Sequence, residues 1–115
     1  MTKTKRLTIE ANVEGKQLND REFVAGFLKD LAQRIDMEPL AGPFIAEGRK
    51  IPGLTGALLI ETSHIIVHHY TDPEKSNRTR VVLDIYSIKE FDGHDVKKYM
   101  NKHYGHLSNV EIFLR

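Results

Sequence analysis

Four side chains suited to proton-transfer chemistry lie within one short segment of this chain. Thr55 and Ser63 supply hydroxyl groups, and His64 and His68 supply imidazoles. A hydroxyl becomes a nucleophile when a base takes its proton, and histidine is well suited to that role near neutral pH. The segment 53–68 is therefore a candidate site for nucleophilic chemistry.

The same histidines, together with Asp84, could instead be considered as ligands of a divalent metal. Residues four apart on a strand lie about 13 Å from each other, so His64 and His68 cannot share one ion unless the strand bends. The chain has no cysteine, which excludes disulfides, thiolate ligands and a cysteine nucleophile. We expect no metal site.

Alternation of apolar and polar residues shows which elements position these side chains. The pattern predicts strands near 7–13, 40–46, 55–62, 63–71, 81–86 and 110–114, of which the second is short and irregular. Helical spacing predicts one helix over about 20–36, capped by Asn19 or Asp20, and another from Asp92 to Gly105. A turn is expected over 72–77. The fold class that fits is α+β, a two-layer sandwich with a mostly antiparallel sheet and two helices on one face. We expect a single domain over residues 1–115.

Strand parity assigns the candidate residues to one face of this sheet. Ile65, Val67, Val81, Leu83 and Ile85 should meet the helices, and the other face should carry His64, Ile66, His68, Tyr70, Asp84, Tyr86 and Ile88. A face that mixes imidazoles, a carboxylate and phenols with apolar residues either holds a site or is covered by a second subunit.

Composition excludes several other classes of function. Lys and Arg number 17 and Asp and Glu 16, so the net charge is +1, which argues against a nucleic-acid partner. Only Tyr70 and Tyr86 are candidates for stacking on RNA bases, and no aromatic RNA-binding motif is present. The longest apolar run, residues 57–60, is too short to span a membrane, and no apolar region follows the basic N-terminus. A cytoplasmic protein is expected.

Two segments carry a resemblance to a known family. The run Gly53-Leu54-Thr55-Gly56 and the later Ser63-His64-Ile65-Ile66-Val67-His68 resemble prokaryotic S-adenosylmethionine decarboxylases, with their G-[hydrophobic]-[ST]-G turn and E-S-H-x-[ST]-[hydrophobic]-H strand. The run Val82-Leu83-Asp84-Ile85-Tyr86-Ser87-Ile88 resembles the strand A-[hydrophobic]-D-[hydrophobic]-F-T-C of that family. The resemblance covers most of the chain.

The resemblance implies a pyruvoyl-dependent decarboxylase of polyamine (spermidine) biosynthesis. Its cofactor is a pyruvoyl group that the protein makes from its own serine by cutting the chain, here between Thr62 and Ser63. The resemblance assigns the processing histidine to His68 and the hydroxyl that bonds an oxyanion to Thr55. The substrate is a small amine, S-adenosylmethionine or a relative, with contacts expected from His64, Asp84, Tyr86 and Tyr70. Ser63, His68 and Thr55 should converge.

Two departures from the family pattern predict impaired or altered activity. The cysteine that resembles a general acid falls on Ile88, which cannot donate a proton, and the glutamate before the serine becomes Thr62. The alternative is an unprocessed, non-catalytic homologue that acts as a binding or regulatory partner.

A homodimer is expected from the apolar residues that two helices cannot cover. These are Ile66, Val82, Ile88 and either Leu58 or Ile60. The resemblance also implies that active sites lie near a subunit interface.

Overall fold

A computed structural model describes residues 4–14, 18–71, 74 and 77–115. Within these residues the chain forms six strands and two helices. Their bounds are β1 Lys5–Glu14, α1 Arg21–Arg34, β2 Pro39–Glu47, β3 Gly53–Ile60, β4 Ser63–Thr71, β5 Arg78–Ser87, α2 Gly93–Tyr104 and β6 Leu107–Leu114. The turn expected over 72–77 lies largely outside the described residues.

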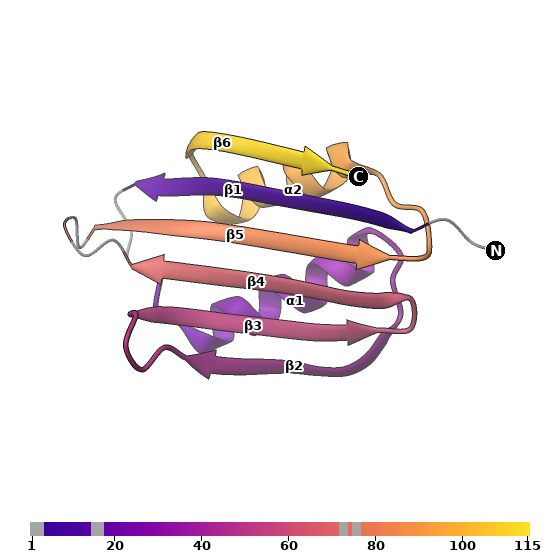
Figure 1. The fold of residues 1–115 in the computed structure, drawn as a ribbon, viewed down its shortest axis with the longest axis horizontal. Coiled ribbons are helices and arrows are strands. Elements are labelled where there is room, and N and C mark those ends of the chain that lie inside the picture. Colours follow the sequence, from indigo (N-terminus) through magenta and orange to yellow (C-terminus); the bar gives the residue numbers. More distant parts are fainter. Residues whose placement is uncertain (1–3, 15–17, 72–73, 75–76) are drawn as a thin grey trace.

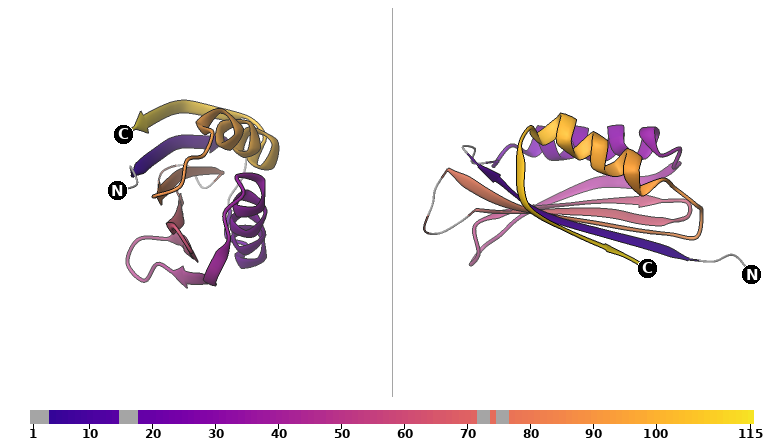
Figure 2. Two further views of the ribbon diagram at one scale, coloured as in Figure 1. Left: turned by 90° about the vertical axis from the view of Figure 1, so that its right-hand side faces the viewer. Right: turned by 90° about the horizontal axis from the view of Figure 1, so that it is seen from above.

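The strands form one antiparallel sheet in the order β2-β3-β4-β5-β1-β6 (Figure 1). Figure 2 shows α1 and α2 lying together on one side of this sheet, so the opposite side is free of helices. We call that opposite side the open face. The predicted two-layer α+β sandwich is confirmed. Neither helix of the described residues is long and apolar enough to cross a membrane.

Both helices begin at the caps read from the sequence, and α2 also ends at the predicted glycine. The Asp20 carboxylate accepts hydrogen bonds from two backbone N–H groups of the first turn of α1, and Asp92 caps α2 by accepting one, from the N–H of His94. Gly105, with φ of 84°, ends α2 in a conformation that favours glycine. The helices therefore start where their charged caps satisfy backbone donors.

The core lies between the helices and the sheet, and strand parity decides which residues enter it. The five residues expected to meet the helices are all fully buried. Helix α1 approaches β3 so closely that a Cβ at Gly56 would lie 2.4 Å from Cγ1 of Val24. The absence of a side chain at Gly56 therefore allows α1 to pack closely against β3.

Strand β2 matches the irregular strand expected near 40–46. Its pairing with β3 shifts register on both sides of Ala41, which is where a bulged edge strand departs from regular pairing.

The open face carries a band of apolar side chains, with one correction to the expected set. Leu58 and Ile60 are buried on the helix side, and Leu59 is the large apolar residue that β3 places on the open face, 41% exposed. Phe44 of β2 and Phe113 of β6 are also about half exposed, at 56% and 49%. The homodimer stays a prediction, with Leu59 replacing Leu58 or Ile60 in its motivation.

Candidate active site

The expected cleavage position lies in the tight connection between β3 and β4. Strand β3 ends at Ile60 and β4 begins at Ser63, so only two residues join them. Ser63 has a φ of 147°, a backbone conformation that residues with a side chain rarely adopt. Strain of this kind clusters at functional sites. The residue that directly follows the Thr62–Ser63 peptide bond therefore has an unusual backbone conformation.

Hydrogen bonds fix the Thr62 side of this peptide bond. The backbone N–H of Ile88 donates to the Thr62 carbonyl oxygen at 3.0 Å. The Ser87 hydroxyl donates to Thr62 Oγ1 at 2.9 Å, and Thr62 Oγ1 approaches Met37 Sδ at 3.4 Å. The Thr62 side chain, at the position where the resemblance expects a glutamate, thus points toward buried Ser87 and away from the open face.

The imidazole of His64 lies between Ser63 and Asp84. Its Nδ1 is 3.4 Å from Ser63 Oγ, a long contact, and its Nε2 is 3.3 Å from Asp84 Oδ2. A carboxylate only accepts hydrogen bonds, so Nε2 carries the proton in the neutral ring and the lone pair of Nδ1 faces Ser63. The three side chains form a hydroxyl–imidazole–carboxylate series.

Strand β1 fixes Asp84 in place. Thr8 Oγ1 donates to Asp84 Oδ1 at 3.0 Å, and Arg6 Nε lies 3.2 Å from the same oxygen. The Arg6 guanidinium also lies over the Tyr86 ring, 5.0 Å from its centroid, and Tyr86 stacks against His64 at 5.9 Å. This end of the open face is therefore a packed, charged cluster, which we call the Ser63 cluster.

The open face is hollowed beside this cluster. A cavity of about 390 Å³ is lined by Thr4, Arg6, Tyr86 and Arg115. Small-molecule sites commonly begin at about 300 Å³, so the space is enough for a small amine.

Thr55 and His68 form a second group, the His68 pair. They face each other across β3 and β4, and Thr55 Oγ1 lies 2.9 Å from His68 Nδ1. Tyr70 stacks on the His68 ring at 5.5 Å, with the rings 9° from parallel. Burial lowers the pKa of His68 below its ordinary value, and the negative charge of Asp84 opposes this in part. His68 thus favours its neutral, proton-accepting form.

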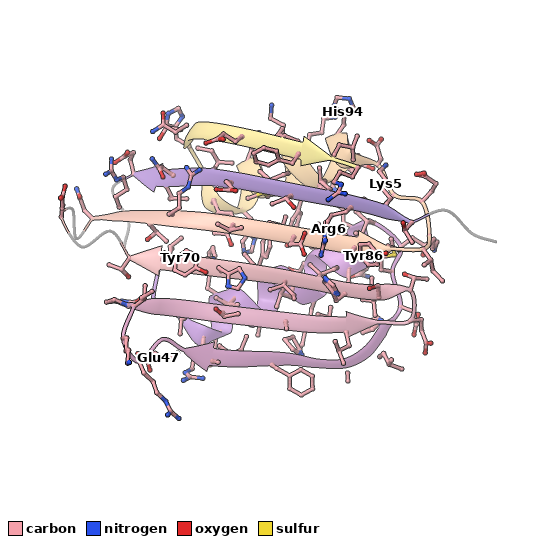
Figure 3. The ribbon with its side chains drawn as sticks, in the orientation of Figure 1. Lys5, Arg6, Glu47, Tyr70, Tyr86 and His94 are labelled. Carbon is pink, nitrogen blue, oxygen red and sulfur yellow. The ribbon has the colours of Figure 1, made fainter. Side chains whose placement is uncertain are left out.

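The structure does not bring the His68 pair to Ser63 within one chain. Thr55 pairs with His68, whereas Ser63 pairs with Ile60, five residues further along β3. At about 3.3 Å per residue the separation is about 16 Å. Figure 3 shows the same division, with Tyr70 and Tyr86 toward opposite ends of the sheet. The expected convergence is therefore wrong within a single chain, because these residues lie far apart along one straight hairpin.

The sequence reasoning missed the contributions of Arg6, Thr8 and the Ile88 N–H. Alternation with Leu7 and Ile9 already places Arg6 and Thr8 on the open face. Their contact with Asp84 requires β1 to pair with β5, a long-range pairing that no local pattern specifies.

Among the residues that the structure describes, no three His, Asp or Glu side chains gather closely enough to hold a metal ion.

A comparison with family models supports the resemblance noted in the sequence. The model for S-adenosylmethionine decarboxylase matches residues 6–112 of the 115-residue chain, a range that contains both the Ser63 cluster and the His68 pair. A search among curated proteins finds no match to the chain. Because the match spans nearly the whole fold, the chain belongs to the S-adenosylmethionine decarboxylase family.

Proposed function

We propose that this protein decarboxylates S-adenosylmethionine or a closely related amine with a pyruvoyl group made from Ser63. The observation that carries the proposal is the strained Ser63, at φ 147°, directly after the peptide bond that must be cut. Family membership over residues 6–112 supports the same chemistry. The proposed setting is polyamine biosynthesis in the cytoplasm.

The residues around Ser63 fit such a group. The pyruvoyl carbonyl supplies a covalent attachment for the substrate amine and an electron sink for loss of CO₂. The adjoining cavity leaves room for the substrate next to Tyr86, whose ring already accepts the Arg6 cation on its face. A ring in this position can also contact a cationic substrate such as a sulfonium.

Turnover is expected to be slow because Ile88 cannot protonate the product carbon. Ile88 follows β5 directly, is 44% exposed, and its N–H contacts the Thr62 carbonyl, so its side chain position lies beside Ser63. Loss of a positioned general acid typically costs about 10²–10⁴-fold in rate. His64 and Tyr86, which stack together here, are the candidates to replace it.

We further propose that two copies pack open face to open face with antiparallel strands. Such a two-fold arrangement places the His68 pair of one copy opposite the Ser63 cluster of the other. The exposed Phe44, Leu59 and Phe113 supply apolar surface for the contact. The separation of the two groups within one chain would then be a consequence of sharing one site between two chains.

The test is the intact mass of the purified protein, together with release of labelled CO₂ from carboxyl-labelled S-adenosylmethionine. We expect slow cutting into residues 1–62 and 63–115 and weak decarboxylation. Ile88→Cys should raise decarboxylation by at least about tenfold, since it restores a proton donor and keeps the backbone N–H. Ile88→Val is the matched control, because it changes size slightly and supplies no acid.

Each alternative result has a defined meaning. Full cutting with ordinary turnover in the wild-type protein would contradict the emphasis on the missing cysteine. A chain that never cuts, with or without Ile88→Cys, would favour the unprocessed homologue that acts as a binding or regulatory partner.

A further inference from the structure

We infer that Ser63 is activated inside its own chain, with His64 as the base, Asp84 as the positioning residue and the Ile88 N–H as the oxyanion donor. This inference rests on the proposed function and replaces His68 as the group that takes the serine proton. It concerns the first step of self-cleavage, in which the Thr62–Ser63 peptide becomes an ester.

The first support is the orientation of the His64 ring. Its Nδ1 faces Ser63 Oγ at 3.4 Å and its Nε2 faces Asp84 Oδ2 at 3.3 Å. Thr8 and Arg6 hold Asp84 through Oδ1, and Arg6 Nη2 also donates to Oδ2 at 3.4 Å, so the carboxylate cannot easily turn away. A base that is oriented by a third group is the arrangement that activates serine nucleophiles generally.

The second support is the donor already placed on the reacting carbonyl. The Thr62 oxygen accepts the Ile88 N–H at 3.0 Å, and this oxygen acquires negative charge when the carbonyl carbon is attacked. The Thr62 hydroxyl is held by Ser87, which prevents the turn from rotating this carbonyl away from the donor.

The step balances with these groups alone. Ser63 Oγ bonds to the Thr62 carbonyl carbon, and its proton passes to His64 Nδ1. The carbon–nitrogen bond between Thr62 and Ser63 then breaks, and its electron pair stays on the Ser63 nitrogen. That nitrogen takes the proton back from His64, which leaves an ester at Ser63 Oγ and a free amine.

His68 cannot take this proton within the same chain, because it lies about five residues away along β4. Ester formation should therefore be a property of a single chain, and its rate should not change with protein concentration. Any role of the His68 pair belongs to a different step or to a second copy.

The experiment traps the ester with hydroxylamine, which cuts the chain at Thr62 and leaves fragment 63–115 with an unmodified serine. Intact mass over time gives the rate of trapped cutting. His64→Ala should lower that rate by about 10²–10⁴-fold, and free imidazole should restore part of it. Restoration by imidazole separates a chemical role from a structural one. His94→Ala, on the exposed surface of α2, is the matched control and should cut at the wild-type rate.

Two further variants test the other groups. Asp84→Asn should lower the rate by up to about 10⁴-fold, because the amide can donate to Nε2 and place the ring in the wrong tautomer. Ile88→Pro removes the N–H and should cost about 10²–10³-fold, whereas Ile88→Ala keeps the N–H and should lose much less of the rate. Circular dichroism of each variant checks that it is folded.

The outcomes separate this inference from the proposed function. Wild-type rates in His64→Ala, with cutting blocked in Ser63→Ala, would overturn the role of His64 and leave the proposed function standing. A rate that rises with protein concentration would also overturn the single-chain step. A wild-type chain that hydroxylamine never cuts would overturn both.

Discussion

Strand β4 carries adjacent polar residues at each end, and the two ends are built differently. Ser63 and His64 begin the strand beside Asp84 and Arg6, where the imidazole has a carboxylate partner. His68 and His69 lie near the other end on opposite faces, where burial lowers the pKa of both. One end orients its imidazole with charge, and the other keeps its imidazoles neutral.

This contrast follows from what each end packs against. His69 is 1% exposed on the helix side, and its Nε2 lies 2.6 Å from the hydroxyl of Tyr104 in α2. Burial raises the pKa of Tyr104, so the phenol keeps its proton and shares a neutral hydrogen bond with His69. A cleavage site needs a polarised nucleophile, which the Ser63 end provides, whereas burial at the His68 end disfavours the protonated form of both imidazoles.

The largest effect is expected at Ser63, at the beginning of β4, where a substitution should prevent self-cleavage altogether. Ser63→Ala should abolish cutting between residues 62 and 63, because alanine has no hydroxyl that could attack the Thr62 carbonyl carbon. Intact mass after long incubation measures this, and Ser108→Ala on β6 is the matched control. Cutting at the same bond in Ser63→Ala would show that the two ends do not differ in the way described.

The second effect concerns buried His69, near the other end of β4, and is measured as the pH dependence of stability. Burial lowers the pKa of His69 from 6.5 to about 4 in the folded protein. Between these two values the unfolded chain binds a proton that the folded protein does not bind, so the free energy of unfolding falls as the pH is lowered through this window. The total loss attributable to His69 is about 3 kcal/mol.

Urea unfolding at pH 7 and at pH 4.5 measures most of this loss, which is complete only below the folded pKa of about 4. His69→Leu should show a smaller decrease between the two pH values than the wild-type protein. An equal decrease in both proteins would mean that other groups cause the acid sensitivity. It would also mean that keeping His69 neutral does not lower the free energy of unfolding at low pH.

The smallest effect concerns the hydrogen bond of the His68 pair. Thr55→Val removes the hydroxyl that lies 2.9 Å from His68 Nδ1 with little change in shape. The loss should be about 1 kcal/mol in the free energy of unfolding, as for a typical hydrogen bond. A double-mutant cycle with His68→Ala should give a coupling of similar size, whereas additive effects would show that the two side chains do not support each other.

Local patterns predicted the fold well because the signals for each helix and strand lie within a few neighbouring residues. Alternation placed Ile65 and Val67 in the core, and Asp20 and Asp92 marked the helix starts. The same parity placed the chemistry of β4 on the open face. What parity cannot give is position along a strand relative to other strands.

The error in the site came from that missing information. Thr55 and Ser63 are close in sequence, but they stand at opposite ends of a hairpin whose turn follows Ile60. The role of the Ile88 N–H could not be predicted from the sequence for another reason. Every residue except proline has a backbone N–H, and only the fold decides where it points.

The strand order has a consequence for the cut protein. Residues 1–62 hold β1, β2 and β3, and residues 63–115 hold β4, β5 and β6, yet β1 lies between β5 and β6. The two pieces are therefore interleaved, with three shared strand borders, and neither can leave without dismantling the sheet. Once such a protein unfolds, its pieces diffuse apart and must find each other again. Refolding then becomes a second-order reaction that fails on dilution, so each cut molecule is held together by the slowness of its own unfolding.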